Sequence, residues 1–200
     1  MSRPSTSSIL APTKDVDARH KAGHDSEMTT TIRSAELSDI AAITRIYAHA
    51  VLHGTASFEL EPPDEAEITQ RYTALLSGRF PYIVAEIEGE VAGYAYAGPY
   101  RARPAYRFTV EDSIYIDPAM QRRGVGRALL ERLLVEAEAE GFRQMVAVIG
   151  DSNQNPSIAL HEALGFRMVG TFEAVGYKFG RWLDSVLMQK ALGKGATTIP

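Results

Sequence analysis

The stretch that most constrains this 200-residue chain is a strand-like run followed by a glycine-bearing loop and an amphipathic helix. Residues 113–117 read as a β-strand, Pro118 marks a tight turn, and helical periodicity begins near Val125. Gly124 and Gly126 lack a Cβ, so the backbone can turn sharply there and present several N–H groups to one point. Because the first amides of a helix are unpaired and lie at the positive end of its dipole, the loop predicts a site for a pyrophosphate.

Three kinds of phosphate-binding loop compete for this stretch. A dinucleotide fingerprint requires a third glycine where Leu129 stands, and a P-loop requires Lys and Ser or Thr where the chain has Arg127-Ala128, so both interpretations fail. The remaining pattern, Gln121-x-x-Gly124-x-Gly126, resembles the acetyl-CoA loop of the GNAT N-acetyltransferases, in which backbone amides hold the pyrophosphate. An ordinary helix-starting loop is the alternative, and the flanking sequence has to decide.

Composition narrows the class of protein. A chain of 200 residues that is 45% hydrophobic suits one compact α/β domain. Its net charge of −4 gives no general attraction to nucleic acid or to an anionic membrane, so we expect neither as a partner. The chain has no cysteine, which excludes disulfides, thiolate metal sites and cysteine nucleophiles. His49 and His53 are four residues apart with no third ligand nearby, and we expect no metal.

The two ends of the chain read as tails. Residues 1–28 lack apolar periodicity and predict a flexible segment, residues 29–190 predict the folded domain, and residues 191–200 predict a short second tail. The first segment has no apolar signal-peptide core, and its acidic residues argue against an organelle transit peptide, so we expect a cytoplasmic protein. Met28 is either the true start or the edge of the fold.

Periodicity predicts the elements between the tails. Ser38 and Asp39 are expected to cap the first helix, and Asn155 the last one, with Pro156 at its first helical position. Ile68, Tyr72, Leu75 and Leu76 are expected to face inward from the second helix. Strands are expected at residues 30–35, 82–87, 91–97, 108–117, 142–149, 167–173 and 181–190, and helices at 40–52, 64–77, 125–140 and 155–164.

A second motif follows the pyrophosphate loop at the spacing that GNAT enzymes have, namely Asn155-x-x-x-Ala159-Leu160-His161-Glu162-x-x-Gly165-Phe166. Four segments also resemble one branch of that superfamily, the phosphinothricin N-acetyltransferases: TVEDSIYI (109–116), VAVIG (146–150), LHEALGF (160–166) and GYKFGRWLD (176–184). The resemblance covers about residues 30–190. Four separated motifs in the same order make coincidence an inadequate explanation.

The resemblance implies an α/β (α+β) fold with a mixed, mostly antiparallel sheet, flanked by helices and splayed at its centre. Acetyl-CoA would enter between residues 108–117 and 142–149, pairing like an extra strand with the backbone of Ile114, Tyr115 and Ile116. For Asn155, the helix cap is an equally good explanation. The remaining cofactor-binding residues implied are Gln121, Arg122, Arg123, Gly124, Val125, Gly126, Arg127, Asn153, Asn155 and Ser157.

Acetylation requires a neutral amine, and therefore a base that takes its proton. Glu111 stands where the family has its proposed catalytic glutamate, on the polar face of its strand, although a solvated strand carboxylate is the alternative. Asp112 interrupts the apolar face, and a buried carboxylate there needs partners. His161 replaces a tyrosine that in many relatives protonates the leaving thiolate; it could do the same, act in the proton path, or simply be a helix residue. A backbone N–H, that of Ile116, would meet the oxyanion.

Acceptor choice is expected in the arginine-bearing loop before that strand. Arg101, Arg103 and Arg107 can clamp carboxylate, phosphinate or sulfone oxygens, with a solvated basic loop as the alternative. Tyr106 and Phe58 are expected to wall the acceptor side chain. Lys178 and Trp182 would complete the pocket or a dimer contact, since members of this family are usually homodimers.

These features predict an N-acetyltransferase that moves acetyl from acetyl-CoA directly to the α-amino group of phosphinothricin, methionine sulfoximine or methionine sulfone, with Glu111 as general base. Two alternatives stay open. The acceptor could be another amine, namely an amino acid, a polyamine or a protein N-terminus. The chain could also be a non-catalytic acyl-CoA-binding module, against which the presence of both Glu111 and His161 speaks.

Overall fold

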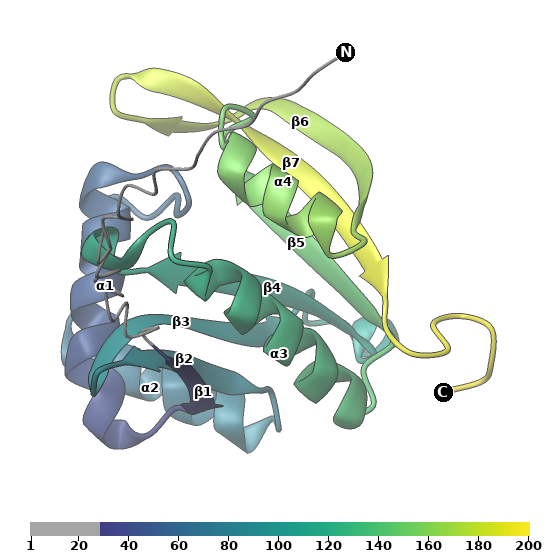
Figure 1. Cartoon of the computed structure of the whole chain (residues 1–200). Coiled ribbons are helices and arrows are strands. Elements are labelled where there is room, and N and C mark those ends of the chain that lie inside the picture. Colours follow the sequence, from purple (N-terminus) through teal and green to yellow (C-terminus); the bar gives the residue numbers. More distant parts are fainter. Residues whose placement is uncertain (1–28) are drawn as a thin grey trace, which may run out of the picture.

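The architecture follows from strands that are apolar on both faces, such as Tyr82–Ile87, and that pair into one sheet. The computed structural model describes residues 29–200, so the tail expected at residues 1–28 lies outside the described residues (Figure 1). Within them, a seven-stranded sheet has the order β1-β2-β3-β4-β5-β7-β6, in which β4 and β5 run parallel and the other neighbours antiparallel. The strands are β1 (Thr30–Ser34), β2 (Tyr82–Ile87), β3 (Glu90–Pro99), β4 (Thr109–Ile116), β5 (Gln144–Gly150), β6 (Arg167–Lys178) and β7 (Arg181–Ala191). The predicted fold class is confirmed.

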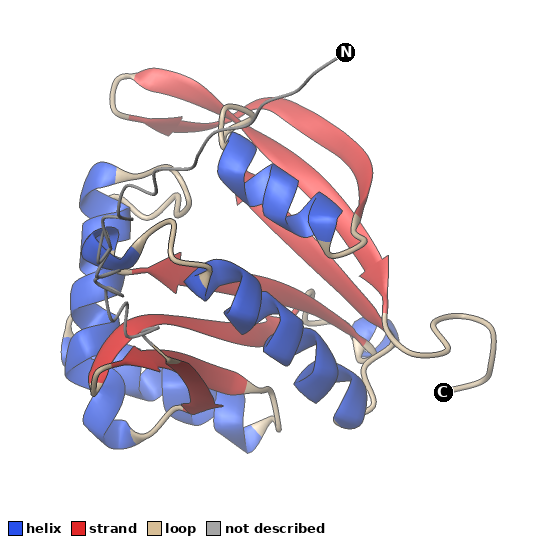
Figure 2. Ribbon diagram, in the orientation of Figure 1, coloured by secondary structure: helices blue, strands red, loops and turns tan. Residues whose placement is uncertain are grey.

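Four α-helices flank this sheet in the described part of the chain, joined by short 3₁₀ turns (Figure 2). In α3, which was expected to be amphipathic, the stripe of Val125, Leu129, Leu133 and Ala137 is buried, and Gly141, at φ +90°, follows the end of the helix. The helices are α1 (Ile40–His53), α2 (Glu65–Ser77), α3 (Val125–Ala139) and α4 (Asn155–Ala163), and the 3₁₀ turns are η1 (Leu37–Asp39), η2 (Pro104–Tyr106) and η3 (Pro118–Met120).

Each face of the sheet carries its own core. On one face, Leu129 and Leu133 of α3 pack with Met145 and Met188 from the strands, and α4 adds Leu160. On the other face, α1 and α2 cover a cluster rich in tyrosine. Both layers of helices are therefore anchored by apolar burial, worth roughly 1.5–3 kcal/mol for each fully buried large side chain. No helix among residues 29–200 is both long enough and apolar enough to span a bilayer.

Several local predictions were wrong. Asp39 does not cap α1, because its carboxylate instead accepts hydrogen bonds from the Arg33 guanidinium and from the Glu36 amide. Asn155 is the first residue of α4 rather than its cap, since Gln154 occupies the cap position. Neither the pairing of Asp39 with Arg33 on the preceding strand nor the start of α4 one residue earlier is visible in helix-cap spacing.

The C-terminal hairpin is longer than expected. The second half of β6, predicted as a connection, pairs with β7 through Lys178 after a register shift between Phe172 and Gly176. β7 continues to Ala191, and the following Leu192 is buried in the core. In α2, Ile68 and Tyr72 are buried as predicted, but Leu76 is 45% exposed, contrary to prediction.

Candidate active site

The centre of the sheet forks between its two parallel strands. β4 and β5 pair only from Thr109 opposite Gln144 to Asp112 opposite Ala147. Beyond that point β4 continues to Ile116 along β3, while β5 continues to Gly150 along β7, so the two strands diverge (Figure 1). The splayed sheet that the resemblance implied is therefore present in this chain.

The free edge of β4 can be assigned residue by residue. The Tyr100 amide donates to Thr109 O and the Asp117 amide donates to Ala92 O, so the odd-numbered residues of β4 direct their backbone groups toward β3. The even-numbered Ile114 and Ile116 then direct theirs into the fork. By this alternation, the backbone groups of Tyr115 face β3 and are not candidates for contact with a ligand in the fork. The candidates are the backbone groups of Ile114 and Ile116.

The loop after β4 ends in an exposed helix N-terminus. Gly124 caps α3 in the left-handed region at φ +80°, where an L side chain would be strained although nothing in the chain lies within 4 Å of its missing Cβ. The Ala128 amide is the first to donate to the preceding turn, at Gly124 O, so the amides of residues 125–127 precede the helical hydrogen-bond pattern. This arrangement fits a pyrophosphate, and it is continuous with the free edge at Ile116.

The side chains predicted around this loop are spread on its surface. Gln121, Arg122 and Arg123 are exposed, and Arg127 forms an ion pair with Glu131 at 2.8 Å. Across the fork, Asn153 and Asn155 are exposed at the start of α4, and Ser157 is half-buried. The loop itself is fixed by Asp117, which accepts from the Ala119 amide at 2.9 Å and from Arg45 Nη1 of α1 at 2.8 Å.

Glu111 faces the core that α1 and α2 cover. It shares this face of β4 with Ser113 and Tyr115, and Tyr115 packs against Tyr47 and Tyr94. Burial, reinforced by the nearby charge of Asp112, raises the pKa of Glu111 to about 7, and the opposing effect of Arg101 is smaller. A carboxylate with this pKa is suited to accept a proton near neutral pH.

His161 lies on the other face, so it does not contact Glu111. Its Nε2 lies 3.0 Å from Asp112 Oδ2, and its Nδ1 lies 2.7 Å from the Ser157 carbonyl. Burial alone lowers the pKa of His161, but Asp112 and the Ser157 carbonyl together raise it above its ordinary value. Asp112 is thus the buried carboxylate that required a partner, and the partner is His161.

The predicted acceptor residues fall into two groups. Arg101, Arg103, Tyr106 and Arg107 lie on the exposed segment around η2, where the Arg101 guanidinium stacks on Tyr100 and acts electrostatically on Glu111. All four residues are exposed, and Arg107 Nη1 donates to Pro104 O at 3.3 Å.

Phe58 and Lys178 hold the loop between α1 and α2 (residues 54–64) against the C-terminal strands. The Phe58 ring lies against Gly150 and Gly176, where an added Cβ would come within 2.7 Å and 2.3 Å of it, respectively. Lys178 is buried and donates to Gly54 O at 3.0 Å and to Ser57 O at 2.7 Å. Lys178 therefore positions the loop, and Phe58 is 39% exposed beside the fork.

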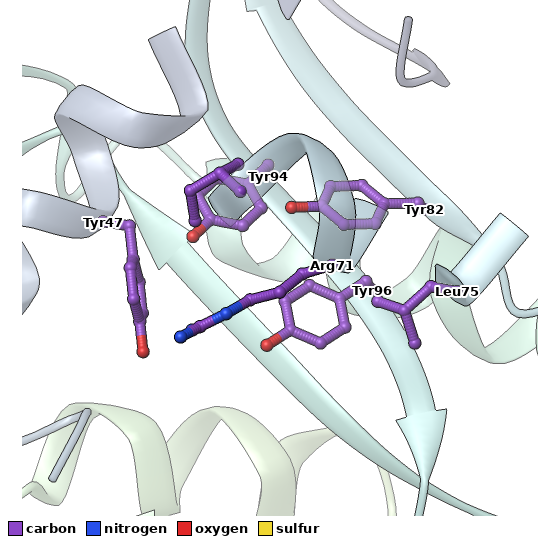
Figure 3. Close-up of a pocket in the computed structure, with 7 residues that line it drawn as sticks. Tyr47, Arg71, Leu75, Tyr82, Tyr94 and Tyr96 are labelled. Carbon is purple, nitrogen blue, oxygen red and sulfur yellow. The ribbon is translucent and has the colours of Figure 1, made fainter. Parts of the chain in front are cut away.

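A tyrosine-lined pocket on the Glu111 side was not predicted. The Arg71 side chain extends toward the space between Tyr47 and Tyr96, and its Nη1 pairs with Glu59 Oε1 at 2.6 Å (Figure 3). The sequence did contain a signal for it: Tyr94 and Tyr96 are two residues apart in β3, and alternate residues of a strand share a face. The pocket is lined by Tyr47, Ile68, Arg71, Leu75, Tyr82, Tyr94 and Tyr96.

Comparison with known proteins agrees with this geometry. Residues 32–187 match the family model described as an acetyltransferase (GNAT) domain. Phosphinothricin N-acetyltransferase of Alcaligenes faecalis is 51% identical over 170 residues, which cover 85% of this chain and 86% of that protein. The L-methionine sulfoximine/L-methionine sulfone acetyltransferase of Salmonella typhimurium is 45% identical over 166 residues, covering 83% and 96%.

A solved structure extends the agreement to three dimensions. The crystal structure of a GNAT superfamily phosphinothricin acetyltransferase from Sinorhizobium meliloti, in complex with acetyl-CoA, superposes with a TM-score of 0.84 at 49% identity, covering 86% of this chain and 94% of that one. The family model and the identity over most of the chain lead to one conclusion: the chain belongs to the GNAT family of acetyltransferases.

Proposed function

We propose that this enzyme transfers the acetyl group of acetyl-CoA directly to the α-amino group of a small amino-acid analogue such as phosphinothricin, methionine sulfoximine or methionine sulfone. The observation that carries the proposal is the free edge of β4, which leads from Glu111 to the amides at the start of α3. Relatives at 45–51% identity that are named for these acceptors support the choice of substrate.

The backbone of the fork would hold the acetyl donor. Ile114 and Ile116 offer N–H and C=O groups along the cleft, and the amides of residues 125–127 offer donors to a pyrophosphate. Arg122, Arg123 and Arg127 add positive charge at the same end. Acetyl-CoA, when bound, supplies an acetyl group activated as a thioester.

Glu111 would act as the general base. An ammonium group has no lone pair, so the acceptor must lose a proton before it can attack, and the Glu111 carboxylate takes that proton on its side of the sheet. The Ile116 amide donates to the oxyanion, and His161 gives a proton to the leaving sulfur from the opposite face. Base and acid therefore act from opposite sides of one strand.

The arginine-bearing segment around η2 would select the acceptor. Arg101, Arg103 and Arg107 present paired N–H donors that suit carboxylate, phosphinate and sulfone oxygens. Tyr106 and Phe58 supply apolar walls, both being 39% exposed. Lys178 would contribute to the acceptor site indirectly, because it holds the loop between α1 and α2 in place.

The enzyme would work as a homodimer built on the C-terminal hairpin. β6 is an edge strand of the sheet, and this hairpin exposes an unusual run of large apolar side chains. More than half of each of these side chains is exposed: Phe172, Val175, Tyr177, Phe179 and Trp182.

Release of free thiol from acetyl-CoA tests the function. The purified enzyme is assayed with phosphinothricin, methionine sulfoximine, methionine sulfone, common amino acids, polyamines and a peptide. Rapid release with the first three alone is the expected result. Thiol release only with other amines would show that the acceptor belongs to another class of amine. Binding of acetyl-CoA without thiol release in the presence of any acceptor would indicate a non-catalytic acyl-CoA-binding module.

A further inference from the structure

A buried pair joins the two sides of the fork at the point where they separate. Asp112 is the last residue of β4 that pairs with β5, and His161 comes from α4, which packs over β5 and β6. Their side chains are 3% and 4% exposed, respectively. The bond between them therefore lies at the inner end of the cleft, on the face opposite Glu111.

The hydrogen-bond contacts of the His161 ring determine which of its nitrogens carry protons. The Ser157 carbonyl can only accept, so Nδ1 carries a hydrogen and donates it across 2.7 Å. Nε2 lies 3.0 Å from Asp112 Oδ2, a distance that requires one further proton between nitrogen and oxygen. The pair as a whole therefore holds one more proton than a neutral imidazole and a carboxylate would.

The surroundings place that proton under the control of Asp112. The Phe166 ring packs edge-on against the imidazole, with ring centroids 4.9 Å apart. The hydrogen-bond partner of the imidazole on α4 is the neutral Ser157 carbonyl, and the residue of β5 opposite Asp112 is Ala147. Glu111 lies on the other face of β4. Asp112 is thus the charged group that acts on His161, and it raises the pKa of the imidazole against the effect of burial.

A role in stability alone explains this pair poorly. Asp112 Oδ1 is buried and accepts no hydrogen bond from the described residues, so the protein pairs only one of the two carboxylate oxygens. Buried ion pairs often add no net stability compared with apolar residues of the same volume. Titratable groups with this kind of burial and a specific charge partner, at a cleft, are typical of functional sites.

We propose that Asp112 is a positioning residue that keeps His161 protonated and its ring fixed, so that the fork holds a proton for the departing thiolate. The proposal rests on the proposed function. The ammonium first loses one proton through Glu111 to water. Glu111 then accepts the second proton that nitrogen loses as the N–C bond forms, and the pair gives its proton to sulfur as the C–S bond breaks. Exchange with water then restores both groups, which balances one proton taken and one given.

The variant Asp112→Asn tests this role with little change in shape. Its amide can donate to Nε2 of a neutral imidazole that still donates to Ser157, so His161 should stay in place without its charge. The chemical shifts of the ring nitrogens follow the titration of His161, assigned with His161→Gln. We expect the pKa of His161 to fall below its ordinary value, because burial then outweighs the remaining, smaller effect of the Ser157 carbonyl.

Turnover provides the second readout. We expect kcat to fall about 10²-fold, at the low end for general acid catalysis, while KM for acetyl-CoA stays close to that of the wild type. In a plot of kcat against pH, the fall at alkaline pH should move to lower pH.

Glu111→Gln is the matched control for the titration, since it removes the adjacent carboxylate and should leave the His161 titration unchanged.

The outcomes separate this proposal from the proposed function. An unshifted His161 titration in Asp112→Asn, or a wild-type kcat in that variant, overturns the role of Asp112. A wild-type enzyme that releases no thiol with any acceptor overturns the proposed function, and the titration then still decides whether Asp112 controls His161.

Discussion

At the scale of single residues, Glu111 and Asp112 are adjacent in sequence and opposite in surroundings. The alternation of β4 turns Glu111 toward the tyrosine pocket and Asp112 toward α4. Removal from water raises the pKa of Glu111 to about 7, and the charge of Asp112 adds to the shift. One strand thus presents a proton acceptor on one face and a partner for a cation on the other.

With Glu111 as the proposed base, this raised pKa predicts the pH dependence of the reaction. Glu111 is protonated below about pH 7 and able to accept a proton above it, so kcat/KM for the amine should fall as pH drops through about 7. Glu111→Gln should remove this limb and lower kcat about 10²- to 10⁴-fold. Calorimetric titration with acetyl-CoA should give the wild-type affinity. Undiminished turnover in this variant would assign the base elsewhere.

A second prediction at the scale of single residues concerns Gly176 in β6. In Gly176→Ala the new Cβ would come 2.3 Å from Phe58 Cε2, so the ring has to leave its position. We expect a loss of about 1–3 kcal/mol in the free energy of unfolding, as for overpacked sites, together with a raised KM for the acceptor. Urea denaturation and steady-state kinetics measure the two effects.

Gly170→Ala is the control for this substitution. It lies in the same strand, and nothing lies within 4 Å of its missing Cβ. Equal effects of the two variants would mean that strand backbone, rather than contact with Phe58, is responsible.

At the scale of elements, the link between β1 and α1 depends on a carboxylate that is not a helix cap. Asp39 accepts from Arg33 Nη1 at 2.7 Å and from Nη2 at 2.8 Å, and its side chain is 6% exposed. The hydrogen bond from Arg33 lowers the pKa of Asp39 despite burial. The strand and the start of the helix are therefore joined by a bidentate ion pair.

Asp39→Ala should cost about 2–3 kcal/mol in the free energy of unfolding, because the guanidinium loses its bidentate partner and keeps only the pair of its Nε with Glu86 at 3.0 Å. Since the folded pKa of Asp39 is lowered, its contribution is present above the ordinary value of 3.8 and is lost as pH falls through the folded value. Thermal unfolding at neutral and acidic pH measures both effects. Arg132→Ala, which removes an exposed pair on α3, should cost at most about 0.5 kcal/mol; a similar loss in both variants would contradict the argument.

The same comparison of elements shows what the sequence could predict. Helix stripes and strand positions were recovered because they depend on local periodicity, as in α3 and β4. The Asp39 and Asn155 caps were wrong because a guanidinium on the preceding strand and the exact start of a helix decide them. The Asp112 to His161 contact joins residues 49 apart on two elements, so the need for a partner could be predicted but not its identity.

At the scale of the whole molecule, the C-terminal hairpin presents the apolar surface on which the proposed dimer depends. Trp182→Glu places a charge where an aromatic ring is 63% exposed, and it should convert a dimer into a monomer. Sedimentation equilibrium measures the mass. Val135→Glu on α3, at a side chain with the same 63% exposure, should leave the mass unchanged. A wild-type monomer would contradict the proposal.

The fork also has a consequence for how such an enzyme can evolve. In the proposed function, the acetyl donor would depend on the edge of β4 and on the start of α3, whereas the amine would depend on the α1–α2 loop and on the segment around η2. Substitutions on the second set leave the first intact, because the sheet lies between them. A duplicated gene could therefore drift toward new amines while it retains the donor, which makes each intermediate along the way a working acetyltransferase.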